Sequence, residues 1–269
     1  MSVVLQNGFI GIEQGLNNPR LCWRKVAGTV TASTEAEGFD AKFAYAEELV
    51  NAWRPTAVPA DWTVTFADDA PVSYVGIGAH TIGSSGATVK AQVPDGSGGW
   101  NDVPGCVATP SDDAAILFLL SVQDVGAVRV VVSEAIAEIG YILTGQATEI
   151  PRLAQFTGLP ITESQQVEYR DNTSMTGKPL GRTLQRDGLE FTVEIENLPE
   201  TFRATEWAAF RQAMERGGRQ FFFYAPKPEK YPDEVALAWQ RQPSPFERAI
   251  PNKNISGAIN MTCGGYRQP

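Results

Sequence analysis

Residues suited to metal binding or nucleophilic catalysis are few in this chain of 269 residues. It contains three cysteines, Cys22, Cys106 and Cys263, and a single histidine, His80. No two cysteines are close in sequence, so they cannot form the paired motifs that are typical of zinc and iron–sulfur sites. The spacing indicates reduced, structural thiols and predicts no metal site.

A serine–histidine–acid triad would have to use His80. This residue lies in a loop-like segment, GAHTIGSSG (78–86), directly after a predicted strand over 73–77. A loop histidine, exposed or hydrogen-bonded, is the simpler interpretation. The 31 acidic residues leave carboxylate-pair catalysis open, but no pair stands out by its spacing. We therefore predict no enzyme activity, no catalytic residue and no cofactor.

Three short charged motifs could each bind a ligand or have an ordinary structural role. Asp68-Asp69 and Asp112-Asp113 offer oxygen ligands for calcium, but solvated turn acids are the plainer reading. Arg216-Gly-Gly-Arg219 resembles an RGG segment, yet a single copy also suits the end of a helix. The net charge of −9 argues against stable nucleic-acid binding, which needs clustered basic side chains.

The sequence also argues against membrane insertion and secretion. No apolar run approaches the ~18 residues that a membrane span needs. The first residues, MSVVLQNGFIGIEQGL, lack a basic segment followed by an apolar stretch, so we expect no signal peptide.

The sequence of the first half predicts short strands separated by turn residues. WTVTF (62–66) alternates apolar and polar residues, as a half-buried strand does. Asp95-Gly-Ser-Gly-Gly99 is a turn cluster. We predict an antiparallel sandwich with a short helix near 39–51 and strands over 62–66, 73–77, 87–93, 115–121, 127–133 and 138–144.

The second half mixes strands with a helix. Thr205 could cap a helix that runs to about Arg216, and Gly217-Gly218 would end it. Trp207, Phe210 and Met214 would form its buried stripe. We predict a β-barrel or sandwich that carries this amphipathic helix (about 205–216), with strands over 164–170, 189–196, 220–224, 235–239 and 254–262.

Charge divides the chain near residue 150. Residues 1–150 hold 7 basic and 17 acidic side chains, whereas residues 151–269 hold 15 and 14. We predict two domains, 1–150 and 151–269. Contacts between subunits are expected in the nearly neutral second domain, because surfaces with almost no net charge meet little electrostatic repulsion.

An ordered series of segments in the first half resembles the discoidin-like, galactose-binding jelly roll of the coagulation-factor C-domain type. The resemblance covers about residues 25–148. Its segments are TASTEAEG (31–38), AWRP (52–55), WTVTF (62–66), VGIGAHTIG (75–83), ATVKAQV (87–93), Asp95–Trp100 and the strands over 128–132 and 139–145.

The same segments, with AWRP followed by VGIGAHTIGSSGATV, resemble minor tail and tail-tip proteins of siphophages. The second half, through FFFYAP…YP…W…CGGY, is similar to the β domains with one packed helix of tail-tube and distal-tail proteins. The resemblance implies a structural virion protein of the tail tip or baseplate, assembled in the host cytoplasm. It also implies a homo-oligomeric ring, a hexamer or a trimer, that contacts tube, hub and tape-measure proteins around the DNA channel.

The rival hypothesis is a carbohydrate-binding adhesin that recognises a host surface glycan. Discoidin-like folds often bind sugars through loops at one end, and aromatic faces stack on sugar C–H groups. The candidate glycan-binding residues are Trp53, Arg54, His80 and Trp100. The plainer interpretation is that Trp53 and Trp100 fill the ends of the sandwich or contact neighbouring subunits.

The aromatic run near the end of the chain suggests an assembly surface. Phe221, Phe222, Phe223 and Tyr266 are the candidate interface residues. A partly exposed phenylalanine triplet would mark a subunit interface, whereas a buried one would be core.

Overall fold

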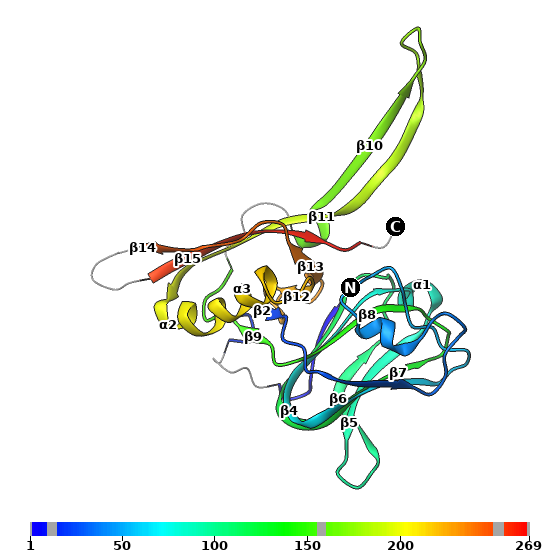
Figure 1. The fold of residues 1–269 in the computed structure, drawn as a ribbon, viewed down its shortest axis with the longest axis vertical. Helices are drawn as coiled ribbons and strands as arrows, with labels where there is room; N and C mark the ends of the chain where they lie inside the picture. Colours follow the sequence, from blue (N-terminus) through cyan, green and yellow to red (C-terminus); the bar gives the residue numbers. More distant parts are fainter. Residues whose placement is uncertain (1, 10–14, 155–159, 250–255, 268–269) are drawn as a thin grey trace.

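The structure is a computed structural model that describes residues 2–9, 15–154, 160–249 and 256–267 (Figure 1). It confirms the predicted mainly-β class with antiparallel sheets. The elements of the first half are β1 (Ser2–Leu5), β2 (Arg20–Cys22), β3 (Gly28–Ala32), the 3-10 helix η1 (Ala41–Tyr45), β4 (Ala60–His80), α1 (Ile82–Ser85), β5 (Thr88–Pro94), β6 (Trp100–Ala108), β7 (Ile116–Ser133), β8 (Ile139–Gly145) and β9 (Thr148–Glu149).

The second half supplies the remaining elements. They are the 3-10 helix η2 (Ile161–Glu163), β10 (Gln165–Thr173), β11 (Pro179–Pro199), α2 (Glu200–Phe202), η3 (Arg203–Trp207), α3 (Ala208–Glu215), β12 (Phe222–Ala225), β13 (Ala236–Gln240), β14 (Phe246–Ala249) and β15 (Ser256–Gly265). The N-terminal part of the strand predicted over 254–262 lies outside the described residues.

The first sheet folds over itself because two of its strands are long enough to serve both layers. The predicted strands over 62–66 and 73–77 are the two ends of β4, and those over 115–121 and 127–133 are the two ends of β7. One end of β4 pairs with β3 and the other with β8. Valine, isoleucine and tryptophan side chains from both layers fill the interior. The result is the predicted antiparallel sandwich, with β1 paired parallel to β7.

The second sheet is open, which corrects the barrel alternative. Its order is β10-β11-β15-β13-β12-β2-β9, with β14 added beside β15. Within the described residues β10 and β9 stand at opposite ends and do not pair, so no closed barrel forms. The sheet instead packs against the helical segment 200–215 (Figure 1).

This helix begins earlier than the sequence predicts. It starts at Glu200, after Pro199, and passes through a π-helical turn, η3, before α3 ends at Glu215. Thr205 is therefore not a cap: its hydroxyl donates to the Thr201 carbonyl inside the helix, at 3.0 Å. The predicted stripe is confirmed, because Trp207 and Phe210 are buried in the core of the second sheet and Met214 packs beside them.

The helix predicted near 39–51 is shorter than expected. Only Ala41–Tyr45 is helical, as the 3-10 turn η1, and the chain on either side is irregular. Tyr45 is held by its hydroxyl, which donates to the Val26 carbonyl at 2.7 Å.

Two short strands from the first 150 residues complete the second sheet. β2 pairs with both β12 and β9, so residues 20–22 and 148–149 lie in the sheet that the second half builds. A further core lies between the two sheets and includes Tyr74, Tyr141, Phe223 and Leu237. Gly76 of β4 makes this packing possible, because a Cβ there would lie 2.4 Å from the Phe223 ring.

A β-hairpin projects from the second sheet, away from the rest of the molecule (Figure 1). We call residues 165–188 the arm. They form the part of β10 and β11 before β11 begins to pair with β15 at Leu189. Among the described residues, neither strand of the arm has a second neighbouring strand.

Candidate functional sites

Three of the four candidate glycan-binding residues gather around residues 138–139. Trp53 forms a bridge with Ile139, His80 pairs with Ile139 across β4 and β8, and Arg54 forms an ion pair with Glu138 at 3.0 Å. Trp53 has no exposed surface, and its indole N–H donates to the Thr34 carbonyl at 3.1 Å. The Trp53 ring therefore offers no face on which a sugar could stack.

His80 is also fully buried. Its Nδ1 accepts a hydrogen bond from the Ile82 amide at 3.2 Å. Burial lowers the pKa of His80 to about 4, although Asp113 opposes the shift. The imidazole is therefore neutral at physiological pH and holds the turn after β4, away from any solvent-exposed ligand.

Arg54 and Trp100 reach the surface in different surroundings. The Arg54 guanidinium lies over the Phe39 ring, 3.9 Å from its centroid. Trp100 is half-buried on β6, and the Arg129 guanidinium covers one of its faces, also at 3.9 Å. Asp102, two residues along the same strand, is paired with Lys90 at 2.8 Å. Of the four candidates, Trp100 has the partly exposed ring beside polar groups that a sugar site needs.

The two acidic pairs considered for calcium lie in different places: Asp68-Asp69 is exposed within β4, and Asp112-Asp113 is engaged in a turn. Asp112 accepts a hydrogen bond from the Ala114 amide and Asp113 one from the Ser84 amide. The described residues contain no cluster of three or more His, Cys, Asp or Glu side chains that could hold a metal ion. None of the helices in the described part of the chain is both long and apolar enough to cross a membrane.

The arm carries an apolar face that the sequence analysis did not identify. Tyr169 and Leu184 are direct cross-strand partners, and Asp171 pairs with Arg182 on the same face at 2.8 Å. Leu180 is a further exposed apolar side chain nearer the tip, at a register shift where Asn172 pairs with Gly181 and Thr173 with Pro179. The exposed fractions of Tyr169, Leu180 and Leu184 are 50%, 70% and 48%. The alternation in 167–171 and 180–184 could have predicted an amphipathic hairpin, but not that nothing would cover it.

The predicted assembly residues divide between the core and a groove. Phe222 and Phe223 are fully buried, in the second-sheet core and the core between the sheets respectively. Phe221 and Tyr266 are half-buried and line an open groove of about 510 Å³. The groove is lined by apolar side chains with a polar rim: Leu49, Met214, Phe221, Trp239, Tyr266, Arg219, Gln220 and Gln240.

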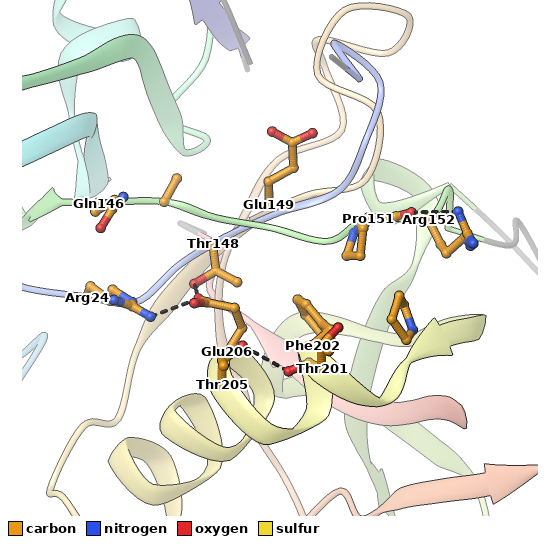
Figure 2. Close-up of a pocket in the computed structure, with 12 residues that line it drawn as sticks. Arg24, Gln146, Thr148, Glu149, Pro151, Arg152, Thr201, Phe202, Thr205 and Glu206 are labelled. Carbon is orange, nitrogen blue, oxygen red and sulfur yellow. Dashed lines mark hydrogen bonds and ion pairs between the residues drawn. The ribbon is translucent and has the colours of Figure 1, made fainter. Parts of the chain in front are cut away.

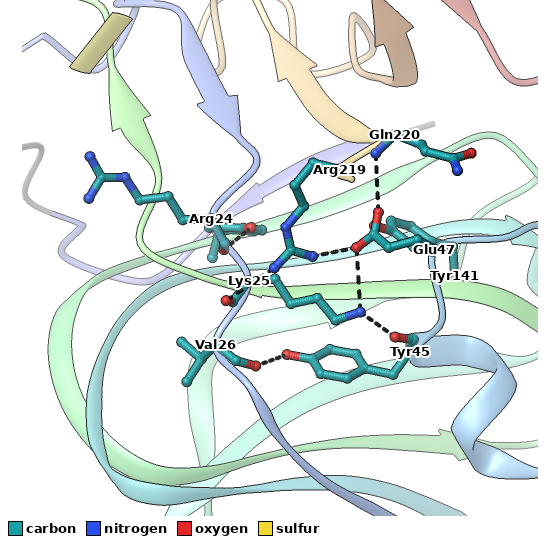
Figure 3. Close-up of polar contacts among 9 residues, drawn as sticks. Arg24, Lys25, Val26, Tyr45, Glu47, Tyr141, Arg219 and Gln220 are labelled. Carbon is teal, nitrogen blue, oxygen red and sulfur yellow. Dashed lines mark hydrogen bonds and ion pairs between the residues drawn. The ribbon is translucent and has the colours of Figure 1, made fainter. Parts of the chain in front are cut away.

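A polar cluster fixes one wall of this groove (Figure 3). The carboxylate of Glu47, from the first half, pairs with Arg219 and Lys25 and accepts a hydrogen bond from the Gln220 amide at 3.3 Å. Burial lowers the pKa of Lys25, and the charge of Glu47 opposes that shift. The cluster connects residues 219–220, just before β12, to the first half. It also gives Arg219 a counter-charge.

A second cavity, of about 490 Å³, lies between the start of the helix and residues 146–152 (Figure 2). One carboxylate oxygen of Glu206 accepts hydrogen bonds from Arg24 at 2.8 Å and from Thr148 at 3.2 Å. The π-helical turn that contains Glu206 faces this segment. The charged groups of Arg24 and Glu206 thus join the helix to the first half.

No protein-family model and no curated protein matches the sequence, so the resemblance to phage tail proteins has no counterpart there. Solved structures of carbohydrate-binding modules match about half of the chain. A pectin-binding module is 13% identical and covers 46% of this chain and 93% of its own, with a TM-score of 0.39. A family 32 module from C. perfringens NanJ, in complex with galactose, is 13% identical over 46% and 98%, with a TM-score of 0.40.

A further match is chitosan-binding module 2 of a chitosanase/glucanase from Paenibacillus, in complex with chitotriose. It is 16% identical and covers 45% of this chain and 98% of its own, with a TM-score of 0.39. Each similarity therefore concerns one part of a longer chain. Identities this low, with TM-scores below 0.5, say nothing about which ligand this chain binds.

Proposed function

We propose that this protein is a structural subunit of a larger assembly, and specifically of a bacteriophage tail tip or baseplate. The observation that carries the assembly role is the arm, a two-stranded ribbon with large apolar side chains exposed on one face. Isolated two-stranded ribbons are marginally stable in water, and unpaired strand edges readily pair with other chains. An exposed arm of this kind is expected to pack against another protein. The tail-tip assignment comes from the sequence resemblance.

The test is the location of the protein in phage particles. Particles from the source strain should carry the protein, and gold-labelled antibodies against it should mark the tail tip. A double variant, Leu180→Lys/Leu184→Lys, should fold normally yet fail to enter particles, because lysines disrupt the apolar face. Met175→Lys, in the connecting turn of the arm, is the matched control and should be incorporated. Purified particles without the protein would refute the tail-tip role.

Carbohydrate binding is a second candidate, supported by the half-buried Trp100 ring with Arg129, Asp102 and Lys90 beside it. Binding on a glycan array that is lost in Trp100→Ala would favour this role. Phe43→Ala, a change of another surface aromatic that lies against Lys42, is a control that should retain the signal. An array with no bound sugar would exclude the adhesin hypothesis for the sugars displayed.

A further inference from the structure

We infer that the arm of one copy docks into the groove of a second copy, so that successive copies associate head to tail. The inference rests on the proposed assembly role and names the partner of the arm. It pairs the exposed apolar side chains of the arm, Tyr169, Leu180 and Leu184, with the groove wall formed by Leu49, Met214, Phe221, Trp239 and Tyr266.

The arm is held away from its own groove. β10 contains nine residues, so at about 3.3 Å per residue the arm extends about 30 Å. Its base adjoins Gly265 and therefore Tyr266, but the ribbon points outward from there (Figure 1). Leu184, in the middle of the arm, lies about 16 Å along the strand from Leu189, so the arm leads away from the groove of its own chain. We therefore expect the occupant of the groove to come from another molecule.

The two surfaces match in chemistry. The charged groups in the middle of the apolar face, Asp171 and Arg182, are paired with each other. Arg219 at the groove is paired with Glu47. Docking therefore leaves no buried charge without a partner, which would be costly. The groove volume of about 510 Å³ is several times the ~150 Å³ that holds a benzene-sized ring, so it accommodates more than one large side chain.

The charge of the second half favours a second copy as the partner. Residues 151–269 carry 15 basic and 14 acidic side chains, so copies meeting through this half do not repel strongly. An arm on one side and a groove on the other give a heterologous contact, which closes into a ring or extends as a filament.

Complementation between two defective variants tests the inference. The arm variant is Leu180→Lys/Leu184→Lys and the groove variant is Leu49→Lys/Met214→Lys. In native mass spectrometry and light scattering of the full chain, the wild type should form oligomers. Each variant alone should self-associate at least about tenfold more weakly, as expected for the loss of central contacts. The controls Met175→Lys and Val50→Lys, both strongly exposed in the structure, should assemble like the wild type.

An equimolar mixture of the two variants gives the decisive result. The intact arm of the groove variant can enter the intact groove of the arm variant, but no second contact is possible. The mixture should therefore form heterodimers and nothing larger. If the wild type assembles but the mixture stays monomeric, the contact is between arms or elsewhere and the inference is overturned.

Two further outcomes separate this inference from the proposed function. A wild-type chain that is monomeric at every concentration overturns the second copy as partner, while the particle-labelling experiment still decides the tail-tip role. If Leu49→Lys/Met214→Lys lowers the unfolding temperature, Gln220→Trp provides a second groove variant, because it fills the groove from an exposed rim position. Wild-type assembly by a folded Gln220→Trp chain would also overturn the inference.

Discussion

His80 and Arg20 are both buried, but His80 is neutral whereas Arg20 is charged and paired. His80 lies inside the first sandwich as a neutral imidazole with a pKa of about 4. Arg20 keeps its charge and forms an ion pair with Glu149 at 3.1 Å, with both side chains 3% exposed. Its guanidinium also donates to the carbonyls of Asn18 and Gly15. Its residue type makes His80 a candidate for catalysis or ligand binding, but its burial and its hydrogen bond to the Ile82 amide indicate a structural role.

Acidification should destabilise the protein through His80. The pKa of the folded state is about 4, below the ordinary 6.5, so the unfolded chain binds the proton first as pH falls. Stability from this residue is complete above pH 6.5 and decreases as pH falls toward 4. We expect a loss of about 1–2 kcal/mol between pH 7 and pH 5.

The measurement is urea unfolding of the wild type and of His80→Asn at both pH values. Asn retains an acceptor for the Ile82 amide but does not titrate, so the variant should lose less stability over the same range. Equal losses in both proteins would show that other groups cause the pH dependence.

Breaking the Arg20–Glu149 pair should be strongly destabilising. Glu149→Gln leaves the Arg20 charge buried without its carboxylate, and we expect a loss of about 3–5 kcal/mol in the free energy of unfolding. The double change Arg20→Met/Glu149→Leu should recover part of that loss, because it removes both charges. Chemical denaturation measures both variants, and a Glu149→Gln protein as stable as the wild type would contradict the expectation.

At the scale of elements, alternation and helical periodicity located most of the first sandwich and the buried stripe of the helix. They did not locate β2 and β9, because strands of three and two residues are too short to show a period. The helix start was misplaced because Thr205 is a good capping residue, whereas the actual start follows Pro199 with no side-chain cap. Local alternation indicates the amphipathic hairpin of the arm but not that its apolar face stays uncovered. The groove depends on packing between distant segments, which local patterns do not report.

The helix should be anchored mainly by Phe210. This side chain is fully buried and contacts Trp23, Trp207 and Phe222, with ring centroids 5.0–5.9 Å away. Phe210→Ala removes these contacts and leaves a cavity, so we expect a loss of about 3–5 kcal/mol in urea unfolding. Arg211→Ala, at a neighbouring position paired with Glu215 in the same helix, should cost less than about 0.5 kcal/mol. Similar losses for both changes would contradict the packing that we describe.

At the scale of the whole molecule, three features join the two sheets: the entry of β2 and β9 from the first half into the second sheet, a core between the sheets, and the cluster around Glu47. The change in charge near residue 150 predicts a domain boundary there, and this boundary remains a prediction. The structure shows that residues on both sides of it build the second sheet. Nothing in the local sequence of β2 indicates that its partner is a strand from the other end of the chain.

The molecule should therefore unfold as one cooperative unit. Calorimetry of the wild type is expected to show a single transition in which the calorimetric and van't Hoff enthalpies agree. Gly76→Val should weaken the contact between the sheets, because its side chain would overlap the Phe223 ring. We expect the variant to unfold at a lower temperature or in two steps. An unchanged single transition would show that the contact does not couple the sheets.

The place of β2 also has a consequence for how the chain is made. Residues 20–22 pair with residues 223–225, so β2 cannot join β12 until the ribosome has released most of the protein. Until then the edge that β2 will occupy is incomplete, and the nascent chain is exposed to mispairing. Contacts between such distant segments also slow folding, because a long loop must be ordered first. Synthesis rate and chaperone supply are therefore expected to affect the yield of this protein more than that of a sandwich that folds from neighbouring strands.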